Sequence, residues 1–288
     1  MKEVLHVYWQ LTKPGVMLGN VLTAVAGYFL AAAGTVDWVV FFAMLVGMVA
    51  VVASACVINN YLDQDIDRVM KRTQKRPSVT GVIPSRHILI YGITLAIIGF
   101  IALYIWTNWL VVSIGVIGFV TYVWLYGALS KRRSVHGTLV GSISGAMPIA
   151  GGYAAVNGVI DPGLIIVFLI LFFWQFPEFF SIGIYRRKDY ADANIPIMPV
   201  ARGIKPTIKQ IYIYTTLYVL STLALTVYGY TGGWYFVVML VAGIVWIRLA
   251  SEGMQTIDPE GWARRMFRVS MYSILLLCVM LVVGPLLP

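Results

Sequence analysis

The segment NNYLDQDIDRVMKRTQKRP, which starts at residue 59, holds the densest set of side chains that could do chemistry. Its Asn59, Asp63 and Asp67 are four residues apart, so on a helix they form a row along one face. Aligned amide and carboxylate oxygens repel one another unless a cation joins them. Magnesium suits such a row, because it takes one or two protein carboxylates and completes its shell with water and phosphate oxygens. We therefore predict magnesium ligands at these three positions.

Several cations follow this row directly, among them Arg72 and Arg76, which are again four residues apart. Guanidinium groups can hold phosphate oxygens bidentately, so an anionic phosphate is their natural partner. A basic connection is also expected from membrane topology alone, which makes the cations weak evidence when taken by themselves. The acidic row has no such explanation, and ionisable groups at a membrane helix end are functional hypotheses first.

A second acidic stretch is WQFPEFFSIGIYRRKDYADANIPIMP. Glu178, Ile182, Tyr185, Asp189 and Asp192 follow steps of four and three, which predicts one continuous helical stripe. Glu178 lies inside an apolar run, where an ionised carboxylate is costly unless it meets a polar cavity or a partner. Two acidic helix ends on the same membrane face could hold two magnesium ions around one diphosphate.

A third cluster, SKRRSVHG, supplies Lys131 and His136. Topology explains such cations as readily as function does. A lone histidine favours a helix-end or capping role over catalysis or iron ligation. The aromatic side chains Trp174, Tyr153 and Tyr185 could line a hydrophobic substrate pocket, although an interfacial belt or the core accounts equally well for each.

Membrane helices must position these groups, because 60% of the 288 residues are hydrophobic, only 11% are charged and the mean hydropathy is +0.84. This composition excludes a soluble globular protein. Continuous apolarity without alternation favours helices over a β-barrel, so the predicted fold class is all-α and polytopic. The nine predicted spans are 14–33, 38–61, 86–105, 109–129, 138–157, 163–184, 208–230, 233–250 and 267–287.

The net charge of +9 reflects topology rather than nucleic-acid binding. Every Lys and Arg falls at the N-terminus or in the connections after the second, fourth, sixth and eighth spans, counting those at the span ends beside these connections. This asymmetry predicts a multi-pass protein of the bacterial plasma membrane with a cytoplasmic N-terminus and an external C-terminus. The first apolar run is too long for a signal peptide and is kept as a span.

Familiar motifs of other chemistries are missing from the sequence. It contains no GxxxxGK[ST] loop, no GxGxxG after a strand, no CxxCH and no nucleophile elbow. Cys56 and Cys278 lie in apolar runs without metal-ligand spacing. A cation-coupled transporter is the main alternative from another class, but both acidic stretches sit at one membrane face and no inverted repeat is evident.

The motifs together resemble the UbiA superfamily of intramembrane prenyltransferases and, within it, the haem O synthase (protohaem IX farnesyltransferase) branch. The resemblance covers essentially the full length as one domain, residues 1–288, through LTKPGVMLGN, NNYLDQDIDRVMKRTQKRP, KRRSVHGTLVGSISGAMP and WQFPEFFSIGIYRRKDYADANIPIMPV. The NxxxDxxxD row marks only the superfamily. Its combination with KRxS, WQxP and DYxxANIPxxPV is much more specific.

The resemblance implies a nine-helix bundle whose central cavity opens to the cytoplasmic face and lipid bilayer, with Mg²⁺ as cofactor. It implies farnesyl diphosphate as donor, a vinyl group of haem B as acceptor and haem O as product. The implied metal ligands are Asn59, Asp63, Asp67, Asp189 and Asp192, of which Asp63, Asp67 and Asp189 are catalytic. The implied diphosphate-binding residues are Arg72, Arg76 and Lys131, and the expected acceptor-binding residues are Glu178, Tyr153, Tyr185 and His136.

One departure concerns the acceptor, because members of this branch commonly carry His where this chain has Glu178. The carboxylate could place the acceptor or supply a further acidic ligand. A UbiA-type enzyme acting on a quinone precursor or another aromatic acceptor is therefore the alternative. The resemblance leaves open whether a haem A synthase or a terminal-oxidase assembly protein docks on the chain.

Overall fold

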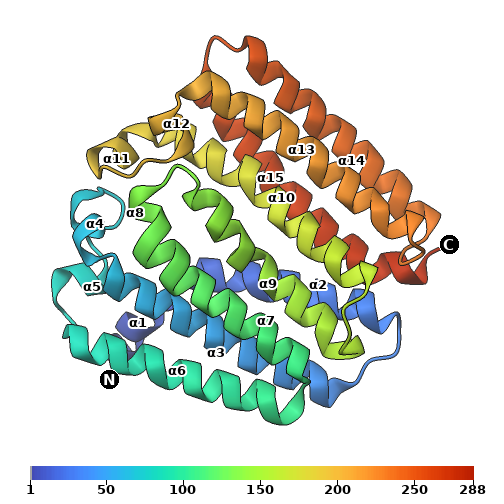
Figure 1. Cartoon of the computed structure of the whole chain (residues 1–288), viewed down its shortest axis with the longest axis horizontal. Coiled ribbons are helices and arrows are strands. Elements are labelled where there is room, and N and C mark those ends of the chain that lie inside the picture. The colour runs from blue at the N-terminus through green and yellow to red at the C-terminus, as the bar shows by residue number, and fades with distance from the viewer. Residues whose placement is uncertain (1) are drawn as a thin grey trace.

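The computed structural model describes residues 2–288, and within that range the chain is helical without any strand (Figure 1). Nine of its helical stretches are long and apolar enough to cross a membrane, which confirms the predicted all-α polytopic class. These spans are α2 (Pro14–Ala32), α3 (Trp38–Leu62), α6 (Ser85–Trp106), α7 with η1 and α8 (Trp109–Arg133), α9 (Gly137–Asn157), α10 (Pro162–Tyr185), α13 (Ile204–Val227), α14 with η2 (Gly233–Gln255) and α15 with η3 (Pro259–Leu286).

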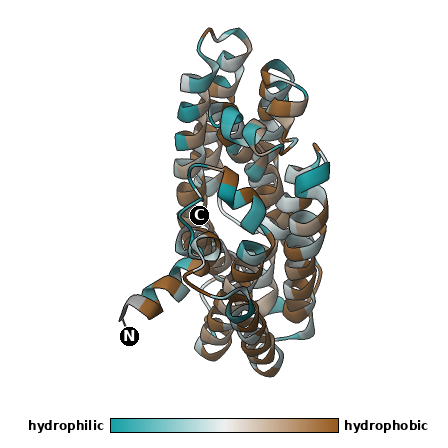
Figure 2. Ribbon diagram, turned by 90° about the vertical axis from the view of Figure 1, so that its left-hand side faces the viewer, coloured by the Kyte–Doolittle hydropathy of each residue, from teal (hydrophilic) through white to brown (hydrophobic). Residues whose placement is uncertain are grey.

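The spans run side by side, and the connections at one end of the bundle carry most of the short helices (Figure 1). We call this end the N-terminal face, defined by the connections 63–84, 134–136, 186–203 and 256–258. Its polar residues stand out against the apolar spans in Figure 2, which looks onto this end of the bundle. The short helices are α1 (Lys2–Leu11), α4 (Gln64–Val69), α5 (Pro77–Thr80), α11 (Arg187–Asp192) and α12 (Met198–Ala201).

Four of the predicted span boundaries were wrong by more than a turn of helix. The fourth span ends at Arg133 rather than 129, and the eighth ends at Gln255 rather than 250. The seventh span begins at Ile204 rather than 208, and the ninth begins at Pro259 rather than 267. In the ninth, the Asp258 side chain accepts a hydrogen bond from the Gly261 amide at 2.9 Å, and Pro259 takes the first helical position. Such a cap starts the helix in polar sequence, which hydropathy alone does not detect.

Close packing of α2 on α9 forms one wall of the bundle and depends on two glycines. A Cβ on Gly27 would lie 2.2 Å from the Ile149 carbonyl oxygen, and one on Gly152 would lie 2.0 Å from that of Ala24. Both distances are far below van der Waals contact, so only glycine lets these backbones approach so closely. The two helices therefore hold a fixed spacing beside the central cavity.

Candidate active site

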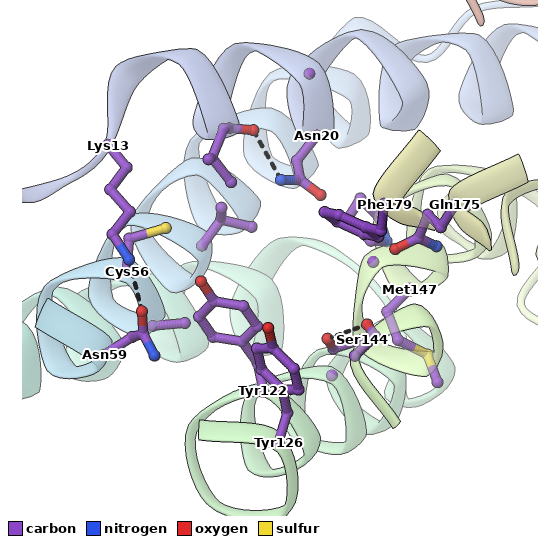
Figure 3. A pocket seen from close by; sticks show the side chains of 18 of the residues that line it. Lys13, Asn20, Cys56, Asn59, Tyr122, Tyr126, Ser144, Met147, Gln175 and Phe179 are labelled. Carbon is purple, nitrogen blue, oxygen red and sulfur yellow. Dashed lines mark hydrogen bonds between the residues drawn. The ribbon is translucent and has the colours of Figure 1, made fainter. Parts of the chain in front are cut away.

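A cavity of 710 Å³ lies among α2, α3, η1 (Thr121–Ser130), α9, α10 and α15. Its deeper wall is apolar, with Met48, Ile114 and Met147 among the lining residues, whereas its end at the N-terminal face is lined by charged side chains. Figure 3 shows part of the cavity lining, with Lys13 and Asn59 on one side of the cavity and Gln175 on the other. A site of this kind suits a ligand with an apolar body and an anionic head.

The predicted row of Asn59, Asp63 and Asp67 lines the charged end of the cavity. Asn59 lies in the last turn of α3, Asp63 separates α3 from α4, and Asp67 lies in α4. The row survives this break because the Asp63 amide donates to the Asn59 carbonyl at 2.9 Å and the Asp67 amide to the Asp63 carbonyl at 2.8 Å. All three side chains are buried, so their charge and polarity need partners inside the protein.

Each of the three side chains in the row contacts a basic side chain from a different part of the sequence. Lys131 Nζ lies 2.5 Å from Asp63 Oδ2, and Arg76 Nη1 lies 2.6 Å from Asp67 Oδ2. Asp63 Oδ1 has no hydrogen-bond partner among the described residues, although Arg132 Nη2 lies 3.9 Å from it. The structure thus brings two of the predicted phosphate-binding cations directly onto the predicted metal ligands.

Lys13 is a third cation at this end, and sequence reasoning gave it no role. Its Nζ donates to Asn59 Oδ1 at 2.5 Å, as the dashed line in Figure 3 shows. Because the Asn59 amide is neutral, this contact leaves the charge of Lys13 without a carboxylate partner among the described residues. Burial lowers the pKa of Lys13 to about 8. The only available signal was its place in LTKPG, directly before the first span.

The backbone at Lys13 is left-handed, with φ 52° and ψ 69°. This conformation is uncommon for a residue with a Cβ and costs on the order of 1 kcal/mol. It turns the chain sharply between α1 and Pro14, the first residue of α2. The turn directs the lysine side chain into the cavity instead of toward solvent.

A π-helical segment, η1, places two tyrosines that were also missed. Tyr122 and Tyr126 line the cavity, with ring centroids 5.9 Å apart, and Lys131 follows directly after the segment. On an α-helix Lys131 would be two and a half turns from Tyr122 and would point roughly the opposite way. The wider turn of a π-helix, which has i→i+5 hydrogen bonds, puts all three side chains on one face.

The helix that carries the acidic row does not continue to Arg72 and Arg76, so their four-residue spacing does not place them on one helix face. The short helix α4 ends at Val69, and Arg76 returns to Asp67 from the residue before α5. Arg72 lies in the intervening turn, is exposed and still lines the cavity. Both arginines therefore reach the site, but a loop presents them rather than one helix face.

The continuous stripe predicted from Glu178 to Asp192 was also wrong, because α10 ends at Tyr185 and the chain turns at Arg186 before α11. Glu178 lines the cavity. Asp189 Oδ2 instead lies 3.7 Å from Arg186 Nη1, and Asp192 is exposed. Neither aspartate lines the cavity. In the described part of the chain, no three His, Cys, Asp or Glu side chains are grouped closely enough to hold a metal ion.

Three of the four predicted acceptor-binding residues do not line the cavity. The Tyr153 hydroxyl donates to Asp161 Oδ2 at 2.9 Å, near the opposite membrane face. Tyr185 packs against Phe267 and under the guanidinium of Arg264, and His136 is an exposed residue that precedes α9. The lining residues beside Glu178 are Trp174, Gln175 and Phe179.

Gln175 has a defined orientation in this wall. Its Nε2 donates to the carbonyl oxygens of Ser142 at 3.0 Å and Leu171 at 2.9 Å. Gly145 leaves the room for it, since a Cβ there would lie 2.0 Å from Gln175 Oε1. The amide oxygen is therefore the group that this side chain can offer to a ligand.

The cavity also reaches the outer surface of the bundle. Leu18 and Leu22 of α2 and Leu275 of α15 line it, and these side chains are 59%, 38% and 50% exposed. All three are apolar, as expected for a surface in contact with lipid. A hydrophobic chain can therefore pass between the membrane and the cavity without crossing water.

Comparison with known proteins agrees with this geometry. The model of the UbiA prenyltransferase family matches residues 20–280. A protein of Yersinia enterocolitica named protoheme IX farnesyltransferase is 45% identical, over 95% of this chain and 93% of its own length. One of Protochlamydia amoebophila with the same name is 42% identical, over 94% and 95%.

Solved structures share the fold at low sequence identity. A structure described under the biosynthesis of digeranylgeranylglyceryl phosphate synthase has a TM-score of 0.83 at 17% identity and covers 98% of this chain and 99% of its own. A UbiA homologue from Archaeoglobus fulgidus bound to DMAPP and Mg²⁺ has a TM-score of 0.71 at 15% identity, covering 96% and 98%. With the family match over most of its length and the buried row of Asn59, Asp63 and Asp67 at the mouth of an intramembrane cavity, the chain belongs to the UbiA prenyltransferase family.

Proposed function

We propose that this enzyme transfers the farnesyl group of farnesyl diphosphate to a vinyl group of haem B in a magnesium-dependent reaction that yields haem O, with the whole chain acting as one domain. The observation that carries the proposal is the buried row of Asn59, Asp63 and Asp67 facing three basic side chains at the charged end of an apolar cavity. The choice of donor and acceptor rests on the full-length relatives named protoheme IX farnesyltransferase.

The row fits a magnesium ion. Its donors are hard oxygens, two carboxylates and one amide, and Asp63 Oδ1 is buried without a hydrogen-bond partner in the described chain. Asn59, Asp63 and Asp67 would hold the metal, whereas the further predicted ligands Asp189 and Asp192 do not line the cavity. When bound, magnesium supplies charge neutralisation to the diphosphate oxygens.

The basic side chains take up the charge of the leaving group. As the bond between C1 of the farnesyl chain and the diphosphate oxygen breaks, the electron pair stays with the diphosphate. Arg72, Arg76 and Lys131, joined by Lys13, stabilise this charge from fixed positions around the cavity mouth. Such preorganised electrostatic stabilisation is usually the largest single contribution to a reaction of this kind.

The cavity wall protects the allylic cation that remains on the farnesyl chain. The rings of Tyr122 and Tyr126 line the cavity next to the diphosphate end, and aromatic faces attract cations and exclude water. Attack by the vinyl group forms the new carbon–carbon bond, and water then captures the resulting cation with loss of a proton. Gln175 lies across the cavity from Lys13 and Asn59 (Figure 3), and Glu178 also lines the cavity, so both would orient the acceptor.

Topology and access follow from the same arrangement. The positive charge at the N-terminal face supports a cytoplasmic N-terminus and a cavity whose charged end opens to the cytoplasm. Farnesyl diphosphate and haem B are both apolar molecules with anionic groups. Both can enter from the bilayer beside Leu18, Leu22 and Leu275 while their charged groups stay at the membrane surface.

The test is an assay of the purified enzyme in lipid nanodiscs with Mg²⁺, farnesyl diphosphate and haem B, followed by mass analysis. We expect a product whose mass equals haem B plus farnesyl and hydroxyl groups, and its loss when EDTA replaces Mg²⁺. Parallel reactions contain 4-hydroxybenzoate as an aromatic acceptor. Prenylation of that acceptor with none of haem B would reject the proposed acceptor, and full activity in EDTA would reject the metal.

A further inference from the structure

The helix α1 has two apolar flanks, although the bundle covers only one of them. Tyr8 packs edge-on against Tyr91 with ring centroids 5.1 Å apart, and Leu11 is buried against Val57 and Ile88. On another flank Leu5 and Trp9, four residues apart, are 63% and 50% exposed. It would be unusual for two large apolar side chains on one face of a ten-residue helix to be exposed to water.

The polar side of α1 lies on a third flank. His6 and Gln10 are also four residues apart, both are exposed, and their side chains hydrogen-bond to each other at 2.8 Å. At about 100° per residue, the Leu5 and Trp9 flank and the His6 and Gln10 flank point in different directions away from the bundle. Such a division of apolar and polar flanks is typical of a helix that lies at a membrane surface.

The position of α1 agrees with this division. Seen from the N-terminal face in Figure 2, α1 extends sideways out of the bundle instead of along the spans. Tyr91, which Tyr8 contacts, lies about two turns inside the membrane-spanning helix α6. The helix therefore lies beside the bundle at the level where the bilayer begins.

We propose that α1 is an interfacial helix that binds the lipid bilayer surface through Leu5 and Trp9, with His6 and Gln10 facing water. A tryptophan at this level matches the known preference of that side chain for the membrane interface. The Leu11 carbonyl accepts a hydrogen bond from Asn60 Nδ2 at 2.8 Å, which ties the end of α1 to α3 beside Asn59. Lipid binding by α1 thereby anchors the turn that carries Lys13.

The proposal is tested with single spin labels on the full chain in liposomes, in a background with Cys56→Ala and Cys278→Ala. Labels at Leu5→Cys, Trp9→Cys and Gln10→Cys report accessibility to oxygen, which dissolves in lipid, and to a water-soluble nickel complex. Ile257→Cys, at a fully exposed loop position, calibrates the aqueous limit, and Ile98→Cys, at a half-exposed position within α6, calibrates the lipid limit.

We expect oxygen-dominated signals at positions 5 and 9, with a depth of about 5–10 Å in the interface, and nickel-dominated signals at position 10. Nickel-dominated signals at all three positions would overturn the proposal, because α1 would then lie in water. Shielding of positions 5 and 9 from both reagents would also overturn it, since a protein partner or second copy would then cover this flank. None of these readouts depends on which acceptor the enzyme uses.

Discussion

The carboxylates at the two membrane faces differ in how their charge is satisfied. At the face opposite the N-terminal face, Asp161 precedes α10 and accepts a hydrogen bond from the Leu164 amide at 2.8 Å and from the Tyr153 hydroxyl at 2.9 Å. Asp37 likewise accepts from the Val39 and Val40 amides at the start of α3. Helix N-termini favour negative charge, so capping explains these residues fully.

Asp63 lies at the other end of α3, where the helix dipole disfavours a negative charge, and its side chain caps no amide of the short helix α4 that follows. Lys131 and Arg76 compensate Asp63 and Asp67, yet Asp63 Oδ1 stays without a hydrogen-bond partner among the described residues. An acidic residue that capping explains is a structural feature. An acidic residue placed against the dipole, buried and incompletely satisfied, is a better candidate for ligand binding.

The largest expected effect is on the acidic row. Asp63→Ala or Asp67→Ala should lower turnover on the order of 100-fold or more, because the site loses an oxygen that organises the diphosphate end. Product formation by purified enzyme in detergent measures this, and a thermal midpoint measured in parallel checks the fold. Asp161→Ala is the control and should retain its kcat. Near-normal turnover of either row variant would make the row a structural feature like Asp161.

The next largest effect is expected at Lys13, and it tests whether this lysine does more than contribute to the positive charge at the N-terminal face. Lys13→Met keeps most of the side-chain length but removes the charge. The kcat/KM for farnesyl diphosphate should then fall about 10- to 100-fold, as expected for the loss of one charged hydrogen bond. Lys13→Arg should restore part of the loss. Lys75→Met changes an exposed lysine that does not line the cavity and serves as the matched control. Equal behaviour of Lys13→Met and Lys75→Met would contradict a role for Lys13.

A moderate effect on stability should mark the capping carboxylates. Asp161→Asn keeps a capping oxygen but replaces Oδ2, the acceptor of the Tyr153 hydroxyl, by an amide NH2 group, so it should destabilise the fold by about 1–2 kcal/mol while kcat stays unchanged. Asp37→Asn keeps the capping oxygen and loses only the favourable negative charge at the helix start, so its thermal midpoint should fall less. A selective loss of kcat in Asp161→Asn would show that the opposite face takes part in the reaction.

The smallest effect concerns Asp65, which lies in α4 between the two buried members of the row but is exposed. The Arg132 guanidinium, 2.5 Å away, lowers the pKa of Asp65 to about 2. A lowered folded-state pKa gives stability that is present above about pH 4 and is lost as the pH falls toward 2. Asp65→Asn should therefore change the thermal midpoint only slightly and equally from pH 5 to 9, and that small difference should shrink below pH 4.

Turnover of Asp65→Asn at pH 7 should match that of the unmodified enzyme. A large loss would mean that Asp65 belongs functionally with Asp63 and Asp67. Position in the segment 63–67, and not burial of the side chain, would then distinguish the functional carboxylates from the capping ones.

Much of the fold could be predicted because membrane spans are local features. About 20 consecutive apolar residues must form a helix in lipid, since no water is present to satisfy the backbone, and all nine spans follow from this rule. The row of Asn59, Asp63 and Asp67 could be predicted for the same reason, because its three residues lie within a few turns at the end of one helix. The stripe from Glu178 to Asp192 failed because spacing does not reveal where a helix turns, here at Arg186.

Short-range pattern was thus sufficient for the spans and for the acidic row, since both depend on neighbours within a few turns of one helix. The cations that meet this row depend on distant contacts and irregular backbone. Lys13 reaches Asn59 across 46 positions through a left-handed turn, and Lys131 reaches Asp63 across 68 positions because a π-helix rotates it toward the cavity. Such conformations cost energy locally and persist only where the surrounding helices stabilise them, so the tertiary structure decided which cations enter the site.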